Sequence, residues 1–570
     1  MHPLDAFRDE VNRIIQATWN YETQVPELET PPDATMGDLG LPCFPLAREL
    51  RKAPPAIAGE MAEAMQPSGW VREIRAVGPY VNFFLDSARL AEYVASDVDG
   101  ALTPPAKPGR ILLEHTSANP NGPLHVGRAR NPILGDTLGR ILRAAGHDVE
   151  TQYYMDNLGR QVALLYKGKQ TFCEEDLPAA ARDKIDHVLV RYYQAANERK
   201  DADPAYAEEV KQLVAQLETA DVQLLADVRE VYEACFSGMR ESLSRLGVDY
   251  DSIKDESDLV AGGDVDATIE RLKQSPRAGQ EDDGANYLDL SAELEGNKST
   301  KFFFTRKDQT SVYATRDVAY HKWKAEQVGE GLLLNVLGED HRLQSLQVSI
   351  ALEELGHRRP EVVFYAFVSL PDGKMSTRAN RVVFLDDLLD EAHALAAEAV
   401  RSRREGELDE AELDAIAEAV GVAAIRFNIA KVQPEKPIAF RWEEALDFDG
   451  DSAPYLMYAH ARAASLLARA AEAGIEPSIH ELGDGEARLA KVLAQFVPEV
   501  EAAAARRAPH RFCAYASRLA GAFNEYYRDH PVLTCDDAQA QQTRLAMVGA
   551  AKKALAKALD ALGIPVLDRM

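Results

Sequence analysis

The sequence predicts a multidomain α/β protein, and three observations support this fold class. The chain has 570 residues, which is too long for a single hydrophobic core. In its middle part, short apolar runs alternate with helical patterns, as they do in α/β domains. Beyond about residue 385, almost every segment has the composition and spacing of a helix. We therefore expect three domains, at 1–105, 106–395 and 396–570.

The first domain is expected to combine helices and strands. LARELRKAPPAIAGEMAEAM (46–65) has helical spacing that a Pro-Pro pair interrupts, and VGPYVNFFL (77–85) alternates as a strand does. Repeated prolines in LTPPAKPGR (102–110) disfavour both regular structures, so we place a linker there. The result is a predicted N-terminal α+β domain.

The second domain opens with a strand–loop–helix unit. ILLEHTS (111–117) is a short apolar strand pattern, an Asn/Pro/Gly turn follows it, and helical spacing runs from about 124 to 145. This order predicts a Rossmann-type parallel sheet. A strand pattern in VETQYYMDN and a helix pattern in LGRQVALLY continue the sheet. Charged amphipathic segments then predict a helical insertion over 171–295. Strand patterns return in KFFFTR, SVYATRD, GLLLNVLG and EVVFYAFVSL, and the third domain is predicted to be an all-helical bundle.

Composition limits where the protein works and what it binds. The net charge of −28 disfavours nucleic-acid binding by the whole surface, although a local basic face would still permit it; the simpler interpretation is a solvated acidic surface. No apolar run is long enough for a membrane helix, and the acidic amphipathic start is unlike a signal peptide. Five cysteines without a CxxC pair indicate buried thiols in a reducing cytosol, with neither disulfides nor zinc. We expect a cytoplasmic protein that binds no membrane.

SANPNGPLHVGRARN (117–131) places a His-x-Gly and two arginines where the first helix begins. Free N–H groups at a helix N-terminus suit a phosphate, and Gly127 would allow close approach. His125 can donate to a phosphate oxygen, while Arg128 and Arg130 add positive charge. By itself this short pattern is weak evidence, and a helix cap is the better interpretation of it.

A second motif decides between these interpretations. LPDGKMSTRANRVVF (370–384) carries Lys374, Ser376, Thr377 and Arg378 on a loop that a glycine precedes. Taken alone, it could be an ordinary surface loop. Because both motifs occur in this order within one interrupted α/β domain, we favour phosphoryl-type chemistry that depends on positioning and charge neutralisation.

These motifs resemble the two signatures of class I aminoacyl-tRNA synthetases. More narrowly, EHTSANPNGPLHVGRARN, MDNLGRQ, YATRD and KMSTR resemble the arginyl-tRNA synthetase family. The similarity extends to MGDLGLPCFPLARELRK in an N-terminal tRNA-contacting domain, and to APYLMYAHARAASLL and the C-terminal residues in a helical anticodon-binding domain.

The resemblance implies an arginine–tRNA ligase. Such an enzyme activates L-arginine with ATP to arginyl-adenylate and pyrophosphate, and then transfers the arginyl group to the 3′-terminal ribose of tRNA(Arg). It implies ATP as a substrate and Mg²⁺ with no protein ligand that we can name, a monomer, and no editing site. The family tends to need tRNA for the first step.

The resemblance also assigns roles to individual residues. Catalysis is expected of His125, Arg128, Lys374 and Arg378. ATP binding is expected of His125, Gly127, Arg128, Gly338, Asp340, His341, Lys374, Met375 and Ser376. Arginine binding is expected of Ser117, Asn119, Asn157, Gln161, Tyr313 and Asp317. The tRNA is expected to contact Tyr455, Tyr458, His460, Arg462, Tyr527 and Arg528, with Tyr526 also available.

Several of these roles have structural alternatives. Asn157 and Gln161 could be a solvated or capping pair, His341 a satisfied structural histidine, and Asp340 a helix cap. The aromatic residues of the helical bundle could instead face its core.

Three positions depart from the family pattern, and they keep other functions open. The first signature usually ends in His, where this chain has Arg128. A lysine often stands where it has Gly122, and a second lysine where it has Thr377 and then Arg378. We expect Arg128 and Arg378 to supply the missing charge. The alternatives are a class I synthetase for another amino acid, a small-molecule nucleotidyltransferase and a non-catalytic tRNA-binding relative. Asn119, Tyr313 and Asp317 argue against the first alternative, the size of the C-terminal helical domain against the second, and Lys374 with Asp317 against the third.

Overall fold

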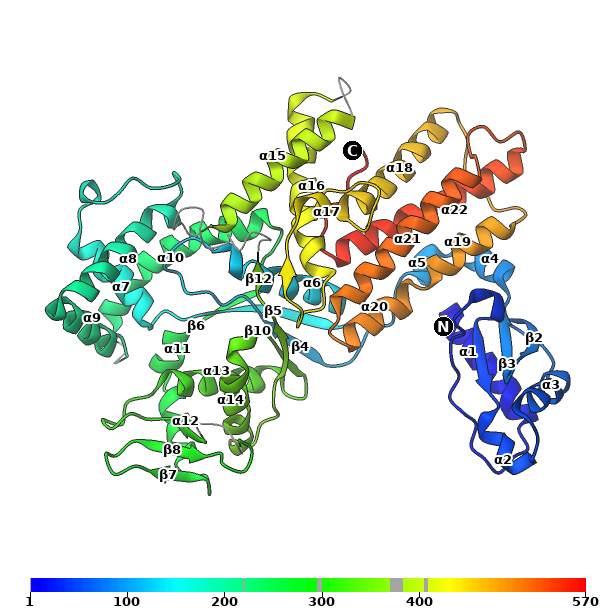
Figure 1. Ribbon diagram of the computed structural model, residues 1–570. Coiled ribbons are helices and arrows are strands. Elements are labelled where there is room, and N and C mark those ends of the chain that lie inside the picture. Colours follow the sequence, from blue (N-terminus) through cyan, green and yellow to red (C-terminus); the bar gives the residue numbers. More distant parts are fainter. Residues whose placement is uncertain (1, 219–220, 295–299, 370–382, 404–407) are drawn as a thin grey trace.

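The computed structural model describes residues 2–218, 221–294, 300–369, 383–403 and 408–570. At its centre lies a five-stranded parallel sheet, which confirms the predicted α/β class (Figure 1). Its strands are β4 (Arg110–Glu114), β5 (Asp148–Met155), β6 (Ser252–Asp255), β10 (Leu332–Gly338) and β11 (Glu361–Tyr365). Their order is β11-β10-β4-β5-β6, and every neighbouring pair is parallel.

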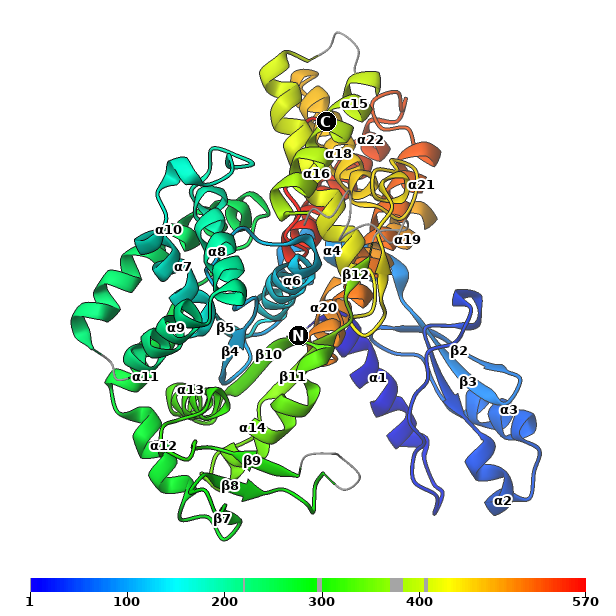
Figure 2. The same cartoon turned by 60° about the vertical axis from the view of Figure 1, so that its left-hand side comes forward.

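The strand order reverses at β4. The chain leaves β4 toward β5 on one side, and the later strand β10 pairs with its other side. In parallel sheets, ligands bind in the crevice at the carboxyl ends of the strands where such a reversal occurs. The helix α6 (Arg130–Ala144) and the helix α13 (Tyr313–Val328) both pack on β4 and β10, from above and below the sheet (Figure 2).

The predicted insertion over 171–295 is mostly helical. After α7 (Arg160–Thr171) come α8 (Ile185–Ala202), α9 (Pro204–Leu217) and α10 (Val222–Arg245), which pack on one another. The chain then returns to the central sheet through β6. The prediction missed β6 because this four-residue edge strand is mostly polar and pairs only with β5.

A small lobe follows β6. Its helices α11 (Glu256–Ala261) and α12 (Asp264–Leu272) agree with the predicted helical insertion. Its antiparallel sheet consists of β7 (Ala278–Gln280) and β8 (Asn286–Asp289), which the prediction missed, and of β9 (Lys301–Phe303), which confirms the strand expected for KFFFTR. The strand expected for SVYATRD is a helix from Tyr313, because the apolar pattern continues with helical spacing and buries Val318 and Ala319. The helix α14 (Arg342–Glu354) packs beside α13.

The N-terminal unit is an antiparallel sheet with helices. Its elements are α1 (Pro3–Thr18), β1 (Leu39–Pro42), α2 (Ala47–Leu50), α3 (Pro54–Ala64), β2 (Val71–Val77), β3 (Tyr80–Leu85), α4 (Ser87–Ser96) and α5 (Val98–Ala101). The expected strand at 77–85 is the second half of a hairpin that turns at Gly78, whose φ of 57° suits glycine. α4 connects this unit to the C-terminal bundle by packing on α19 (Asp484–Ala494) (Figure 1).

The C-terminal part is a helical bundle, as predicted. Its other elements are β12 (Val368–Ser369), α15 (Leu385–Arg403), α16 (Glu410–Ala430), β13 (Ile438–Ala439), α17 (Trp442–Ala445), α18 (Ala453–Glu472), α20 (Phe496–Ala505), α21 (Pro509–Asp529) and α22 (Ala538–Ala561). α16, α20 and α22 pack on α6, so the bundle covers one side of the sheet domain. No helix in the described ranges has both the length and the apolar character to cross a bilayer. Cys43, Cys235 and Cys513 are buried as expected, whereas Cys173 is exposed.

Candidate active site

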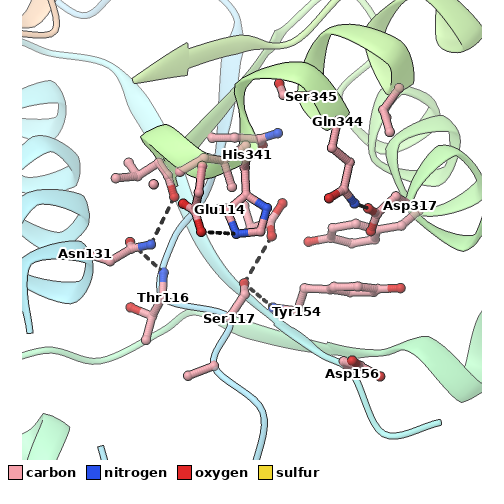
Figure 3. A pocket seen from close by; sticks show the side chains of 18 of the residues that line it. Glu114, Thr116, Ser117, Asn131, Tyr154, Asp156, Asp317, His341, Gln344 and Ser345 are labelled. Carbon is pink, nitrogen blue, oxygen red and sulfur yellow. Dashed lines mark hydrogen bonds and ion pairs between the residues drawn. The ribbon is translucent and has the colours of Figure 1, made fainter. Parts of the chain in front are cut away.

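A cavity of about 310 Å³ opens at the carboxyl ends of β4 and β10, where the strand order reverses. The loop after β4, the start of α13 and the turn after β10 all contribute to its lining (Figure 3). The predicted site residues that line it are Ser117, Asn119, Arg128, Tyr313, Asp317, Gly338, Asp340 and His341. Residues that are up to 224 positions apart in the printed sequence therefore meet in one crevice.

The inner part of this cavity is acidic. Glu114, the last residue of β4, accepts hydrogen bonds from Ser117 Oγ (3.0 Å) and from the buried Lys324 Nζ (2.7 Å). Asp317 on α13 accepts one from Gln344 Nε2 at 2.6 Å. Asp156 accepts one from Asn119 Nδ2 at 3.0 Å. We call Glu114, Asp156 and Asp317 the acidic recess.

The pKa values of the recess show a shortage of positive charge. Burial and the nearby Glu114 carboxylate raise the pKa of Asp317 to about 7. Burial likewise raises the pKa of Asp156, although the Arg316 charge and the Asn119 hydrogen bond oppose it. Beneath them, burial and the Asp156 charge raise the pKa of Glu256 to about 8. Carboxyls that hold their protons this tightly would be stabilised as anions by a cationic ligand.

Tyr313 and Asp317 lie one turn apart at the start of α13, so their side chains share one face of this helix. Both line the cavity, Tyr313 at its exposed mouth and Asp317 deeper inside. Tyr154 and Tyr320 stack at a centroid distance of 4.0 Å, and both also line the cavity. A long cationic side chain that enters past Tyr313 would therefore pass aromatic faces before it reaches Asp317.

The His-x-Gly turn forms a short 3₁₀ helix, Val126–Arg128, just before α6. His125 caps it, since its Nδ1 accepts a hydrogen bond from Gly127 N–H at 3.0 Å. A Cβ on residue 127 would lie 2.9 Å from the His125 ring, so a larger residue there would require this ring to move. Burial and the Arg128 charge lower the pKa of His125, which favours a neutral ring with its proton on Nε2. The capping and phosphate interpretations are thus compatible, because Nε2 remains the donor.

A second cavity lies beside this turn and meets the first at Arg128. It is lined by Gly122, His125, Gly127, Arg128 and Gln161, together with Tyr193 and Phe384. Gly122 packs against α8: a Cβ there would lie 2.5 Å from Val190 Cγ2. The lysine that often occupies this position in the family therefore has no room here.

Two expectations about polar residues in this region are wrong. Asn157 is buried and does not line either cavity; its Nδ2 donates to Tyr232 Oη (3.0 Å) and Ser257 Oγ (2.8 Å), and its Oδ1 accepts from Ser257 N–H (2.9 Å). Gln161 lines the second cavity, which Asn119 and Arg128 also line, so its expected contact with the substrate stays a prediction. Arg130 cannot reach a phosphate, because it is fully buried and donates to the carbonyls of Ala366, Gln433 and Lys436.

Asp340 and His341 lie exposed in a 3₁₀ turn after β10, at the cavity mouth. The alternative of a satisfied structural histidine is therefore wrong for His341, and no side chain caps α14.

Sequence reasoning missed Glu114, Asp156 and Gln344. Glu114 and Asp156 stand at strand ends, which is a readable signal; nothing in the sequence distinguishes Gln344.

The residues predicted to bind tRNA separate into two groups. Tyr458, Arg462 and Tyr527 line a groove between α18 and α21, where the Arg462 guanidinium lies 4.7 Å from the Tyr458 ring centroid and 5.0 Å from that of Tyr527. Three basic residues that the sequence did not single out, Arg469, Lys552 and Arg569, share this groove.

The remaining members of this set lie elsewhere. His460 is buried and bonded to the Leu567 carbonyl at 2.8 Å, so its predicted tRNA contact is wrong. Tyr526 is also buried, and its hydroxyl donates to Glu486 at 2.7 Å. Tyr455 is half-buried outside the groove, and Arg528 is exposed and paired with Asp529.

The KMSTR motif lies outside the described residues, so no structure is assigned to Lys374, Met375, Ser376, Thr377 or Arg378.

The parallel sheet, its crevice and the His-x-Gly turn define a class I aminoacyl-tRNA synthetase fold. A methionyl-tRNA synthetase from Mycobacterium tuberculosis shares this fold, with a TM-score of 0.53 at 14% identity over 81% of this chain and 92% of that chain. Family models match along the chain: "Arginyl tRNA synthetase N terminal domain" at 5–85, "tRNA synthetases class I (R), catalytic domain" at 95–442 and "DALR anticodon binding domain" at 456–570.

The chain belongs to the arginyl-tRNA synthetase family. An arginine–tRNA ligase of Methanothermobacter thermautotrophicus is 42% identical over 552 residues, 95% of each chain. One of Methanocella arvoryzae is 41% identical over 530 residues, 92% of each chain. The arginyl-tRNA synthetase structure of Thermus thermophilus aligns with a TM-score of 0.81 at 30% identity, covering 99% of this chain and 100% of that chain.

Proposed function

We propose that this protein is an arginine–tRNA ligase that charges tRNA(Arg) for protein synthesis. In the first step the carboxylate of L-arginine attacks the α-phosphorus of ATP, the bond to the bridging oxygen breaks, and pyrophosphate leaves with arginyl-adenylate formed. In the second step a hydroxyl of the 3′-terminal ribose of tRNA attacks the arginyl carbonyl, and AMP leaves. The enzyme itself needs no covalent nucleophile, because orientation and charge stabilisation suffice.

The observation that carries the substrate assignment is the acidic recess. Its one paired carboxylate, Glu114, is balanced by Lys324, while the pKa of Asp317 is raised to about 7 by burial and by the Glu114 charge. A guanidinium would supply the missing positive charge and could bond Asp317 through two N–H groups. Tyr313, Ser117 and Asn119 complete the proposed arginine site. Asn157 does not belong to it, because it lines neither cavity, whereas Gln161 lines the adjoining cavity together with Asn119 and could contact the polar head of arginine.

For ATP, we propose a position along the rim between the two cavities. Arg128 lines both cavities, and His125 and Gly127 line the second. Gly338, Asp340 and His341 line the first at the end of β10. His125 would donate through Nε2 and Arg128 would neutralise phosphate charge. Lys374, Met375, Ser376 and Arg378 retain their expected ATP and catalytic roles as part of this proposal.

Magnesium belongs to the proposal only through ATP. Among the described residues that line the cavity beside His125 there is no carboxylate, so the protein offers Mg²⁺ no ligand there. Mg²⁺ prefers phosphate oxygens and water in such sites. We therefore assign it to the nucleotide phosphates and attribute no step to it.

We further propose that the groove around Arg462 takes unstacked anticodon bases. Tyr458 and Tyr527 offer faces for stacking, and Arg462, Arg469 and Lys552 offer positive charge on an otherwise acidic protein. The proposed domains of this protein are 1–105, which contacts tRNA, 106–395 and 396–570. The protein is proposed to be a monomer that works in the cytoplasm.

Pyrophosphate exchange and tRNA charging with a panel of amino acids test the function. We expect arginine alone to be activated and charged in the presence of ATP, Mg²⁺ and tRNA. Asp317→Asn keeps the shape of the recess but removes its charge, so kcat/KM for arginine should fall by about 10²- to 10³-fold, as for a lost buried charge pair. The KM for ATP should stay within about twofold.

Two outcomes would contradict the proposal. Charging of a different amino acid would mean that the acidic recess has been assigned to the wrong substrate. Binding of tRNA without any charging would favour a non-catalytic relative.

A further inference from the structure

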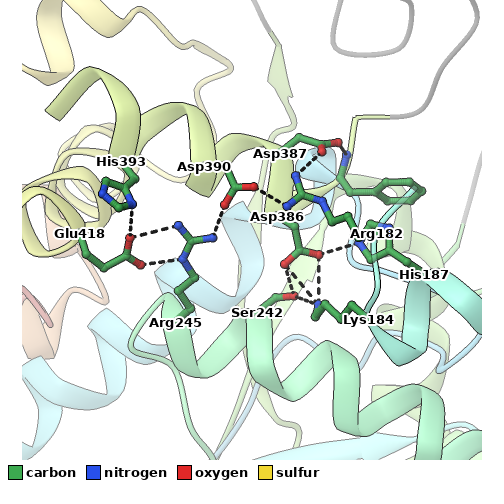
Figure 4. Close-up of polar contacts among 11 residues, drawn as sticks. Arg182, Lys184, His187, Ser242, Arg245, Asp386, Asp387, Asp390, His393 and Glu418 are labelled. Carbon is green, nitrogen blue, oxygen red and sulfur yellow. Dashed lines mark hydrogen bonds and ion pairs between the residues drawn. The ribbon is translucent and has the colours of Figure 1, made fainter. Parts of the chain in front are cut away.

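A buried polar cluster joins the helical insertion to the start of α15 (Figure 4). We call it the Asp386 cluster; it consists of Lys184, Asp186, His187, Ser242 and Asp386. Lys184, Asp186 and His187 lie at the N-terminus of α8, Ser242 lies on α10, and Asp386 lies on α15. Four of the five are buried, and the Lys184 side chain is 14% exposed.

Asp386 accepts hydrogen bonds from three donors. Ser242 Oγ donates to its Oδ1 at 2.8 Å, His187 Nε2 to its Oδ2 at 2.9 Å, and Lys184 Nζ to both at 3.2 and 3.1 Å. Burial by itself would raise the pKa of Asp386, but these donors more than offset it and the pKa lies below its ordinary value. The carboxylate is therefore held ionised, and its orientation is determined from three sides.

The cluster already contains its cation. Asp186, His187 and Asp386 have ligand atoms within 4.8 Å of one another, a spacing that could suit a metal ion. However, the Lys184 ammonium lies 3.0 Å from Asp186 Oδ2 and 3.1 Å from Asp386 Oδ2, and it also donates to Ser242 at 2.6 Å. Because the Lys184 ammonium already lies between the two carboxylates, where a metal ion would have to bind, we regard the cluster as a structural connection rather than a metal site.

Asp386 comes directly after a segment that contacts the His-x-Gly turn. Val126 N–H donates to the Val383 carbonyl at 3.1 Å, and Leu385 N–H donates to the Leu124 carbonyl at 2.7 Å. Between these bonds, Phe384 pairs with His125 as an isolated antiparallel bridge. The Phe384 ring lies 5.0 Å from that of His187 and lines the second cavity. The insertion therefore contacts Asp386 through Lys184, His187 and Ser242, and it contacts Phe384 through His187.

We propose that Lys184, His187 and Asp386 are positioning residues for the adenylation step. They hold residues 383–385 against 124–126, and in this way they set the position of His125 without touching a substrate. The helical insertion then has a catalytic purpose, because α8 and α10 carry the residues that fix Asp386. This inference rests on the proposed function, in which His125 contacts ATP.

The structure supplies a matched control next to the cluster. Arg245 on α10 also bridges to α15 and α16, through Asp390 (2.5 Å) and Glu418 (2.6 Å). It therefore connects the same elements, but its hydrogen-bond partners among the described residues are Asp390 and Glu418, and not Asp386 or Phe384 (Figure 4). Loss of Arg245 tests the packing of the insertion on α15 and α16, whereas loss of Lys184 tests the position of residues 383–385.

The experiment compares Lys184→Met and Asp386→Asn with Arg245→Gln, in the full chain with tRNA present. We expect both cluster variants to lose about 10- to 100-fold in kcat for arginine-dependent pyrophosphate exchange. Their KM for arginine should stay within about twofold, since the acidic recess is untouched. Arg245→Gln should keep kcat within about twofold. Lys184→Arg restores the charge and should recover part of the loss.

Hydrogen–deuterium exchange provides a readout that needs no activity. In Lys184→Met, the amides of Val126 and Leu385 should exchange faster than in the wild type, and in Arg245→Gln they should not. If Lys184→Met folds poorly, Ser242→Ala removes the hydrogen bonds of Ser242 to Asp386 and from Lys184 but leaves the direct Lys184–Asp386 pair, and it should produce the same pattern with smaller amplitude.

Three outcomes separate the two proposals. Unchanged kcat and unchanged amide exchange in the cluster variants would overturn the inference while the proposed function stands. Equal losses in Arg245→Gln would also overturn it, because they would indicate general destabilisation. A wild-type enzyme that does not activate arginine would refute the proposed function, and amide exchange would still decide whether the cluster holds 383–385.

Discussion

At the scale of single residues, burial decides which ionisable groups are prepared for a ligand. Glu114 has Lys324 as its partner within the protein, and the pKa of Glu114 lies below its ordinary value although burial opposes this. Among the side chains of the described residues, the neutral Gln344 alone donates a hydrogen bond to Asp317, and burial raises the pKa of Asp317 to about 7. Two carboxylates in one cavity thus differ in role because only one has a cationic partner.

This difference predicts how arginine binding depends on pH. Below pH 7 Asp317 is increasingly protonated in the free enzyme, and a guanidinium binds the ionised form, so kcat/KM for arginine should fall about tenfold for each pH unit. Above pH 8 it should level off. A pH profile from 5.5 to 8.5 at constant ionic strength measures it. In Asp317→Asn this slope should be absent; a slope that persists would assign the titration to another group.

The same shift affects folding in a defined direction. The folded state binds the Asp317 proton more tightly than the unfolded chain does, because the ordinary pKa of an aspartate is 3.8. The contribution of Asp317 to stability is therefore most favourable below that value and is lost as the pH rises toward 7. Bound arginine would reverse this loss.

At the scale of elements, two helices of the bundle carry some aromatic residues in the core and others near the surface. α18 and α21 bury His460, Phe523 and Tyr526 on their inner faces. Tyr458 on α18 and Tyr527 on α21 are half-buried instead. The Arg462 guanidinium lies beside both of their rings. Neighbouring aromatics in a helix can therefore differ completely in availability, according to their angle around its axis.

The arrangement predicts which arginine matters for tRNA. Arg462→Ala should weaken tRNA binding about tenfold, because stacking and phosphate charge are both lost. Arg528→Ala should stay within about twofold, since Arg528 lies outside the groove and is paired with Asp529. Filter binding at fixed salt compares the two variants. A larger effect of Arg528 would move the tRNA site away from the groove.

At the scale of the whole molecule, one buried ion pair connects three parts of the chain. Arg426 on α16 is fully buried and paired with Asp136 on α6. It also donates to the carbonyls of Leu246, at the end of the insertion helices, and Leu562, at the end of α22. The Arg426 guanidinium thus contacts the sheet domain, the insertion and the bundle at the same time.

Loss of this guanidinium should destabilise the molecule as a unit. Arg426→Met leaves two buried carbonyls without their donor and leaves Asp136 with Arg140 as its remaining cationic partner, so we expect a loss of about 3–5 kcal/mol in stability. Asp136→Asn combined with Arg426→Met should cost less than the sum of the single changes. Thermal unfolding of the three variants measures this. Strict additivity would mean that the two side chains do not depend on each other.

Local patterns were enough to predict much of this protein. The apolar strand before the Asn/Pro/Gly turn predicted β4, and the helical spacing after it predicted α6; the motifs pointed to the family that the comparisons then established. Such features depend on neighbours in the chain, so a sequence displays them directly.

Other features depend on which distant residues meet, and only the tertiary structure decided them. The sequence could not show that Lys324 neutralises Glu114, that Val190 closes the space at Gly122, or that Asn157 turns inward to Ser257. The edge strand β6 was missed for the same reason, because its pairing with β5 gives it a place that its own composition does not signal. Burial and charge balance arise only when segments far apart in the chain come into contact, and they determine which polar side chains remain for a ligand.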